Sequence, residues 1–411
     1  MPKRSHTQET PADWRPTQAV PEPILNTPYE EPTRHWIYRD GFPDRINGRR
    51  PASYWYTSKK LGTRQQDLLA EEERDELELV NRLRVDVKRW REAKYRGAST
   101  VTRDLLLYWT GKDRSRQMFF CQIEAVETVI YLLELGIPGR LTATGYKTFE
   151  VDQALLTNLL AGKRPPFAAE GDTNWPRLVD PSENADDVPL RRLGCKMATG
   201  SGKTAVMAML ITWAFLNRAR NTASTHFPNG IVICAPNLTV KERLQVLRPE
   251  HPWNSYDYFD LVPNKYRDYL ATGKILIMNW HALALKNEHR EGGDTYRVVQ
   301  KGVESVDAFT KDRLGELVER LPVLVLNDEA HHCWRPNLAS SSEEALKALT
   351  KEEKDRFKEE QEEARVWLAG LDRINNCGLN GRTEDGRLRP GVLACVDLSA
   401  TPFYLANSGH P

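Results

Sequence analysis

MATGSGKT, at residues 197–204, is the stretch of sequence that decides the fold of this chain. It follows one apolar segment, RRLGCKMA, and opens another, AVMAMLITWAFL, so the pattern predicts a strand, a tight loop and a helix. Gly200 and Gly202 permit a turn whose backbone N–H groups converge, and such a loop holds phosphate oxygens. Lys203 adds a positive charge for phosphate, and the Thr204 hydroxyl can ligate Mg²⁺. The residues predicted to bind the phosphates of a nucleotide are Thr199, Gly200, Ser201, Gly202, Lys203 and Thr204.

One position departs from the general phosphate-loop pattern. The first residue of that pattern is Gly, and here it is Met197. A glycine-rich turn with a chance lysine is therefore an alternative interpretation of this stretch. The predicted strand before the loop and the predicted helix after it favour the phosphate loop.

Short apolar segments recur on the C-terminal side of this loop. They are apolar throughout rather than alternating, which indicates a parallel sheet covered by helices on both faces. Such a sheet binds its ligands just beyond the carboxyl ends of its strands. We therefore predict an α/β domain with a parallel sheet. Its further strands are GIVICAP (230–236), KILIMNW (274–280), PVLVLND (322–328) and GVLACVDLSA (391–400).

Polar residues follow two of these strands at the point where each strand ends. Asp328 and Glu329 open the sequence DEAH after PVLVLN. A strand-end carboxylate can ligate the Mg²⁺ of a phosphate-loop enzyme, and Glu329 could accept a proton from an attacking water. The sequence SAT, at residues 399–401, ends the last strand. Each signal is weak alone, because Asp-Glu after a strand commonly begins a helix.

The phosphate loop, DEAH and SAT occur in this order, and together they resemble motifs I, II and III of superfamily 2 helicases. The resemblance implies a RecA-like P-loop NTPase domain that binds ATP and Mg²⁺. The site residues that it implies are Lys203, Asp328, Glu329 and His331 for catalysis, Thr204 and Asp328 for Mg²⁺, and Ser399 and Thr401 for coupling.

Three further stretches resemble helicase motifs. Gln122, in FFCQIEAVE, resembles the glutamine that reads adenine, with Phe119 or Phe120 near the base; a polar position on an amphipathic helix is the alternative. APNLT (235–239) resembles motif Ia, which contacts the nucleic-acid backbone. NWH (279–281) resembles another DNA-facing motif, with a strand-end turn around a buried Trp as its alternative. The implied nucleic-acid contacts are Pro236, Asn237, Thr239, Asn279 and His281.

The combination of MATGSGKT, APNLTVKERL, NWHAL, LNDEAHHCW and LSATPFYL resembles the helicase subunit of type III restriction enzymes and its relatives. Upstream, NTPYEEPTRHW, GRRPASYW and FFCQIEAVET resemble the N-terminal part of one such restriction-endonuclease-like family. In that family a second RecA-like domain follows and supplies an arginine finger, and a nuclease domain usually comes after it. The sequence ends ten residues after Thr401, without motifs IV to VI. We therefore expect poor turnover by the isolated chain.

The resemblance implies an ATP-dependent motor that moves DNA in a restriction or phage-defence system. The expected partners are duplex DNA, bound weakly, a second RecA-like domain and nuclease encoded elsewhere or lost, and a methyltransferase or specificity subunit. Two alternatives stay open, because motifs I to III do not separate them. One is a nucleotide-binding scaffold or regulatory fragment without turnover, and the other is an RNA helicase.

The expected domains are a disordered tail over 1–25, an N-terminal extension over 26–112, mostly helical or irregular, and the RecA-like domain over 113–411. Within the extension, periodicity predicts no element over 26–60 and a helix from about residue 66 to residue 94. A charged insert over 340–363 lacks an apolar stripe and predicts a solvated helix.

Composition adds several limits. The net charge is +1, so any nucleic-acid contact must come from a local patch. No apolar run has the length of a membrane span, so we expect no membrane contact. The six cysteines are scattered without a CxxC pair, which fits free thiols in the cytoplasm.

Two other kinds of site are disfavoured by the sequence. His331, His332 and Cys333 are adjacent, and adjacent side chains do not easily converge on one tetrahedral metal ion. A nuclease signature could be composed of Pro43-Asp44 with Asp86-Val-Lys88. The second half of that signature falls in a predicted helix, whereas the nuclease motif needs a strand.

Overall fold

A computed structural model of the chain describes residues 19–39, 42–57, 72–163, 165, 167, 178–182, 184, 186–285, 290–291, 294–295, 304–335 and 350–400. Thr401 and most of the predicted tail lie outside the described residues. The contacts divide the chain into two compact units, Met1–Asn81 and Arg82–Pro411. This division differs from the expected boundary between residues 112 and 113, which stays a prediction.

The smaller unit contains two antiparallel strand pairs. β1 (Arg34–Arg39) pairs with β2 (Phe42–Asn47), and β3 (Ser53–Thr57) pairs with β4 (Glu72–Glu76). The prediction of no element over 26–60 was therefore wrong. Aromatic and β-branched residues in RHWIYR and SYWYT favour strands, and Asp-Gly at 40–41 is a known hairpin signal.

The predicted helix over 66–94 begins later than expected. α1 spans Glu78–Glu92, and the residues before it form β4. EERDE in β4 is rich in helix formers, so helix propensity alone favours a longer helix. Pairing with β3 overrides that propensity, with Ser53 opposite Glu76 and Thr57 opposite Glu72.

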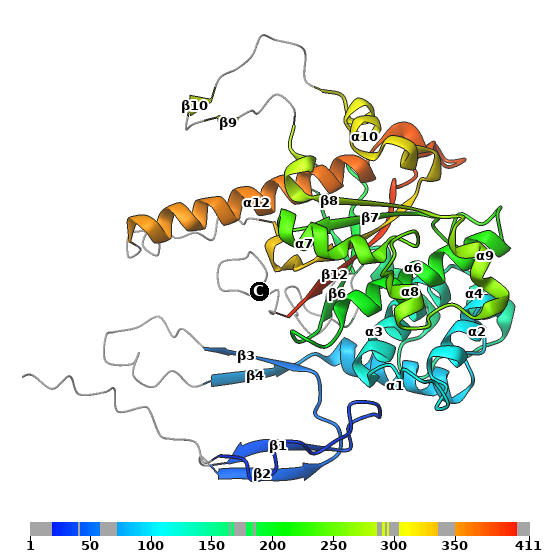
Figure 1. The fold of residues 1–411 in the computed structure, drawn as a ribbon, viewed down its shortest axis with the longest axis vertical. Helices are drawn as coiled ribbons and strands as arrows, with labels where there is room; N and C mark the ends of the chain where they lie inside the picture. Colours follow the sequence, from blue (N-terminus) through cyan, green and yellow to red (C-terminus); the bar gives the residue numbers. More distant parts are fainter. Residues whose placement is uncertain are drawn as a thin grey trace, which may run out of the picture. The chain divides into compact units, whose positions relative to one another are not determined.

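The larger unit is built on a six-stranded sheet with the order β5-β6-β12-β11-β7-β8. Figure 1 labels β6, β12, β7 and β8 of this sheet. β5 pairs antiparallel with β6, and every other pair in this sheet is parallel. The predicted strands are confirmed, and both β7 and β11 are buried at every position. The strands are β5 (Val179–Asp180), β6 (Leu190–Lys196), β7 (Gly230–Ala235), β8 (Lys274–Asn279), β11 (Val323–Asp328) and β12 (Val392–Ser399).

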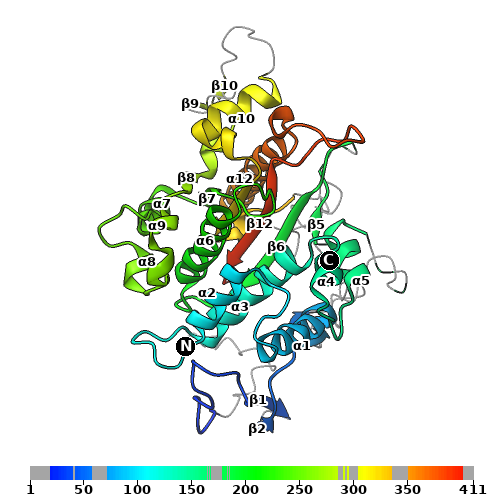
Figure 2. The same ribbon diagram turned by 90° about the vertical axis from the view of Figure 1, so that its right-hand side faces the viewer.

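Helices cover both faces of this sheet, as Figures 1 and 2 show. On one face lies α6 (Lys203–Arg220), with α2 (Thr100–Trp109) and α3 (Phe120–Ile130) packed on it. On the other face lies α12 (Lys351–Asn375), which contacts β6, β12 and α10 (Val306–Leu314). This arrangement is the α/β fold that the sequence predicts.

The helical stretches differ in detail from their expected limits. The region between Thr100 and Ile130 forms two separate helices, because α2 ends at Trp109 and α3 begins at Phe120. α12 begins within the charged insert and continues into an apolar half that buries Trp367 and Leu371. The remaining elements are η2 (Tyr131–Leu135), α4 (Arg140–Thr144), α5 (Gln153–Leu160), α7 (Leu238–Arg243), η3 (Leu244–Leu247), α8 (Ser255–Tyr258), η4 (Asn264–Tyr266), α9 (Arg267–Leu270), η5 (Trp280–Leu283), β9 (Arg290–Glu291), β10 (Asp294–Thr295), η6 (Gly315–Arg320), η7 (Ala330–His332) and η8 (Gly378–Asn380).

The candidate nuclease residues have other surroundings. Asp44 lies on β2 in the smaller unit. Asp86 lies on α1, where its carboxylate accepts hydrogen bonds of 2.8 Å from the backbone N–H groups of Phe149, Glu150 and Val151. The Asp86 carboxylate therefore fastens a loop to α1. None of the helices in the described residues is long and apolar enough to cross a membrane.

Candidate nucleotide-binding site

Three of the predicted motifs meet at one edge of the sheet. β6, β11 and β12 are parallel, and their carboxyl ends carry the phosphate loop, DEAH and SAT. β12 lies between the other two, with Asp328 opposite Leu398 and Lys196 opposite Ser399. The backbone N–H of Met197 donates to the Ser399 carbonyl at 2.8 Å. The structure thus places the first turn of the phosphate loop directly beside SAT.

The phosphate loop joins β6 to α6 through two glycines with positive φ. Gly200 has a φ of 78° and Gly202 a φ of 84°, and Lys203 then begins the 18-residue α6. The unpaired N–H groups at a helix N-terminus, with the positive end of the helix dipole, attract anions. A Cβ added to Gly200 would meet no atom within 4 Å, so this part of the loop borders open space. The loop therefore has the conformation and the room that a phosphate needs.

Gln122 holds this loop to the start of α3. Its Nε2 donates to the Ser201 carbonyl at 2.9 Å, and its Oε1 accepts from the Phe119 N–H at 2.9 Å. The side chain is buried, and a Cβ on Gly202 would lie 2.1 Å from its Nε2. Gln122 thus has a structural contact with the phosphate loop. Its role in reading adenine stays a prediction.

This contact predicts different costs for alanine at the two loop glycines. Both Gly200→Ala and Gly202→Ala force a left-handed conformation on a residue with a Cβ, which costs roughly 1–2 kcal/mol. Gly202→Ala also meets the Gln122 amide, and such overpacking costs about 1–3 kcal/mol more. Urea denaturation measures the free energy of unfolding of both variants.

Adding Gln122→Ala to Gly202→Ala should recover the overpacking part of the loss, because it removes the obstructing amide. The same change beside Gly200→Ala provides the control and should recover nothing. Equal losses in the two single variants would contradict this description of the loop.

Lys203 and Glu329 form an ion pair across the site. Lys203 Nζ lies 3.0 Å from Glu329 Oε1, and their side chains are 12% and 31% exposed. Glu329 has a φ of 47°, which is uncommon for a residue other than glycine. Such backbone strain is concentrated at functional sites. The phosphate-binding cation and the candidate general base are therefore in direct contact.

Asp328 is the buried carboxylate beside this pair. Burial raises its pKa, Glu329 raises it further, and Lys203 acts in the opposite direction. A divalent cation would offset the two adjacent carboxylates, and Mg²⁺ commonly takes one or two carboxylates together with phosphate oxygens. The oxygen donors of Asp328 and Thr204 fit such an ion. No group of three His, Cys, Asp or Glu side chains able to hold a metal occurs among the described residues.

His331 connects the end of β11 to the end of β12. Its Nδ1 lies 2.9 Å from the Ser399 hydroxyl and 3.5 Å from Glu329 Oε2. Burial lowers the His331 pKa and so does neighbouring His332, which favours the neutral ring. A hydrogen bond from Glu363 of α12 instead raises the pKa of His332. The DEAH segment thus contacts SAT through one histidine and α12 through the next.

The residues that resemble nucleic-acid contacts lie farther along the same edge. Asn237 caps α7 by accepting from the Val240 N–H at 2.9 Å, and Thr239 is exposed. Pro236 follows the end of β7. At the end of β8, Asn279 Nδ2 lies 3.2 Å from His281 Nδ1, and the exposed His281 ring stacks on Trp280. The structure places both segments on one edge, and their contact with nucleic acid stays a prediction.

A buried polar network behind the site was missed by the sequence analysis. Asp397 of β12 accepts from Arg192 Nε at 2.7 Å and from Asn327 Nδ2 at 2.6 Å. Trp367 of α12 donates to Asn327 Oδ1 at 3.2 Å. Arg192 also donates to the carbonyl of Cys333, just after DEAH, at 2.7 Å. A polar residue within an otherwise apolar strand, as in VLACVDLS and VLVLND, was the available signal.

The same network extends to β5, the outermost strand of the sheet. Asp180 of β5 accepts from Arg192 at 2.9 Å and from Arg335 at 2.6 Å. Arg335 also forms a bidentate pair with Asp372 of α12, at 2.8 and 2.9 Å. The strands that carry the phosphate loop and DEAH are therefore held to each other and to α12 by buried charges.

Comparison with known proteins agrees with this geometry. No curated protein and no solved structure matched the chain. A family model described as "Type III restriction enzyme, res subunit" matches residues 115–360, more than half of the chain. The matched range includes the phosphate loop, DEAH and four of the parallel strands. The chain belongs to the family of the type III restriction enzyme res subunit, and it contains that family's helicase-like, ATP-binding motor domain.

Proposed function

We propose that the chain binds ATP with Mg²⁺ at this edge of the sheet and uses ATP hydrolysis to move along duplex DNA in a restriction or phage-defence system. The observation that carries the proposal is the 3.0 Å contact between Lys203 and Glu329. It brings a phosphate-binding cation and a candidate base together, next to the buried Asp328.

Each residue has a role that follows from its chemistry. Lys203 and the loop N–H groups would bind the β- and γ-phosphates. Thr204 and Asp328 would hold Mg²⁺, whose charge offsets the charge that develops on the phosphates. Once Lys203 turns to phosphate, the Glu329 carboxylate becomes available to accept a proton from water. His331 and Ser399 would couple this change to the neighbouring strand.

The proposed DNA contact would use the ends of β7 and β8. Asn237, Thr239 and His281 lie on the same edge as the phosphate loop. Since the net charge is only +1, this contact should be local and should weaken steeply with salt. A second RecA-like domain, a nuclease and a methyltransferase or specificity subunit belong to this proposal as partners, as does action in the cytoplasm.

Lys203→Ala is expected to abolish measurable ATP–Mg²⁺ binding, because it removes the only side-chain cation of the phosphate loop. Isothermal titration calorimetry measures the affinity, and thermal melting checks that the variant is folded. Lys274→Ala is the matched control, because Lys274 begins β8 and therefore lies at the opposite edge. If Lys203→Ala and the unmodified chain bind ATP equally, the site is wrong.

The competing functions differ in two measurements. An RNA helicase would bind single-stranded or duplex RNA in preference to duplex DNA of the same sequence, which competition in fluorescence anisotropy would show. A nucleotide-binding scaffold would bind ATP without turnover, even when the second RecA-like domain is supplied. DNA-stimulated hydrolysis under those conditions supports a DNA motor.

A further inference from the structure

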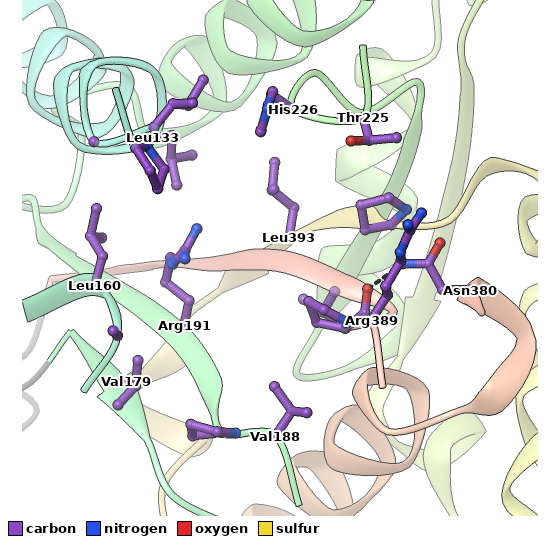
Figure 3. A pocket seen from close by; sticks show the side chains of 18 of the residues that line it. Leu133, Leu160, Val179, Val188, Arg191, Thr225, His226, Asn380, Arg389 and Leu393 are labelled. Atoms are coloured by element: carbon purple, nitrogen blue, oxygen red, sulfur yellow. Dashed lines mark hydrogen bonds between the residues drawn. The ribbon is translucent and has the colours of Figure 1, made fainter. Parts of the chain in front are cut away.

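A cavity lies at the amino ends of the parallel strands, at the opposite edge of the sheet from the nucleotide site. It has a volume of about 580 Å³ and is bordered by the residues where β6, β11 and β12 begin (Figure 3). Leu133, Leu160, Val179 and Leu393 contribute apolar walls. Cavities of about 300–1,000 Å³ with mainly apolar walls are typical sites for small organic ligands. The volume and the apolar lining therefore leave room for a small organic molecule.

Arg191 is a cation inside this cavity, and no carboxylate of the described residues pairs with it. Arg191 extends from β6 into the space between Leu133, Leu160 and Leu393, as Figure 3 shows. Within the described part of the chain its buried Nε has no hydrogen-bond partner, and no carboxylate forms an ion pair with the guanidinium. Burial lowers its pKa, and no charge among the described residues acts in the opposite direction.

Arg192, the next residue in the chain, has the ion-pair partners that Arg191 lacks among the described residues. Arg192 points to the other face of β6, where it pairs with Asp180 and Asp397 and donates to the carbonyl of Cys333. A buried charge normally needs such partners, because its desolvation costs several kcal/mol. Arg191 is half-buried in the cavity, so an anion bound there would supply the partner that the described residues do not.

We propose that this cavity binds a small organic anion, with its negative head group on Arg191 and its apolar body against Leu133, Leu160 and Leu393. Arg389 lines the same cavity and is exposed, so it would contact the head group from the rim. The site is separate from the phosphate loop, because Arg191 lies near the start of β6 and the loop follows its end. A carboxylate and a phosphate monoester share the required chemistry.

Three probes with alkyl bodies of similar length separate the effect of charge from that of apolar contact. We would titrate the 411-residue chain with octanoate, octyl phosphate and octanol by calorimetry, without nucleotide. Octanoate or octyl phosphate should bind saturably, and the preferred head group identifies which class of anion the site takes. Octanol should bind at least about tenfold more weakly, since it has no negative charge and cannot form a bidentate ion pair with Arg191.

Arg191→Met gives the decisive variant. It should reduce the affinity for the anionic probe at least about tenfold, and its melting temperature without a probe should equal or exceed that of the unmodified chain. The second outcome follows because a half-buried charge without a partner among the described residues is replaced by an apolar side chain. Arg192→Met is the matched control and should lower the melting temperature, since it breaks a satisfied network. Arg389→Met should reduce the affinity for the anionic probe less than Arg191→Met does. If Arg191→Met does not fold, Arg389→Met still tests whether the anion binds in this cavity.

Three results would overturn the proposal. Equal affinity for octanol and octanoate would indicate an apolar cavity without anion recognition. Unchanged anion affinity in Arg191→Met would place the binding elsewhere. Failure of all three probes to bind would exclude a small organic anion as the occupant.

Discussion

Glu329→Gln is expected to slow ATP hydrolysis by a factor of about 10² to 10⁴, which is the usual effect of removing a general base. The amide keeps the shape of the carboxylate but cannot accept the proton. For ATP binding, the 3.0 Å ion pair between Glu329 and Lys203 predicts the opposite effect. Glu329 competes with phosphate for Lys203, so its loss should strengthen ATP binding.

The gain in affinity should be modest. A partly exposed ion pair contributes up to about 1 kcal/mol, which corresponds to a factor of about five in the ATP dissociation constant. Calorimetry on the chain measures binding, and single-turnover hydrolysis with the second RecA-like domain supplied measures chemistry. Glu363→Gln is a suitable control, because Glu363 contacts His332 and not Lys203. Full hydrolysis by Glu329→Gln would require another base, and weaker ATP binding would show that Glu329 does not compete with phosphate.

Asp397→Ala should lower the free energy of unfolding of the larger unit by about 3–5 kcal/mol. Asp397 is buried and accepts hydrogen bonds from both Arg192 and Asn327. Its removal leaves the Arg192 guanidinium with Asp180 as its remaining carboxylate partner and leaves the Asn327 amide without this acceptor. Both groups stay buried, so neither recovers its hydration.

Urea denaturation of Asp397→Ala and two further variants tests this account. Asp385→Ala changes an exposed carboxylate and should alter stability by less than about 0.5 kcal/mol. The double variant Arg192→Met/Asp397→Leu should be more stable than Asp397→Ala, because it removes the guanidinium that has lost one of its two carboxylate partners. If Asp397→Ala loses less than about 1 kcal/mol, the network is not needed for stability.

The fold was predictable from sequence because its strands are apolar throughout. GIVICA in β7 and VLVLND in β11 are buried at every position, and that pattern is typical of a parallel sheet covered on both faces. Positions that follow a strand end were predictable too, because parallel strands bring their carboxyl ends to one edge. For this reason the order of the motifs along the chain is enough to predict that Lys203, Asp328 and Ser399 lie close together.

What could not be predicted depends on contacts between distant residues. β3 and β4 form through pairing with each other, and EERDE alone favours a helix. The Lys203–Glu329 pair and the contact of Gln122 with Ser201 depend on side-chain directions that no spacing specifies. The Asp397 network joins strands that lie far apart in the sequence. Its partners could therefore not be assigned, even where a polar residue stood out within an apolar strand.

The position of β12 has a consequence for how the protein is made. β12 follows all other strands of the sheet in sequence, yet it lies between β6 and β11. During synthesis, the piece of sheet formed by β5 and β6 and the piece formed by β11, β7 and β8 therefore lack the strand that pairs with both until residues 392–399 leave the ribosome. Each piece exposes an unpaired strand edge that invites association with other chains. The last strand must enter between them, so a nascent chain stalled before residue 392 should depend on chaperones to avoid aggregation.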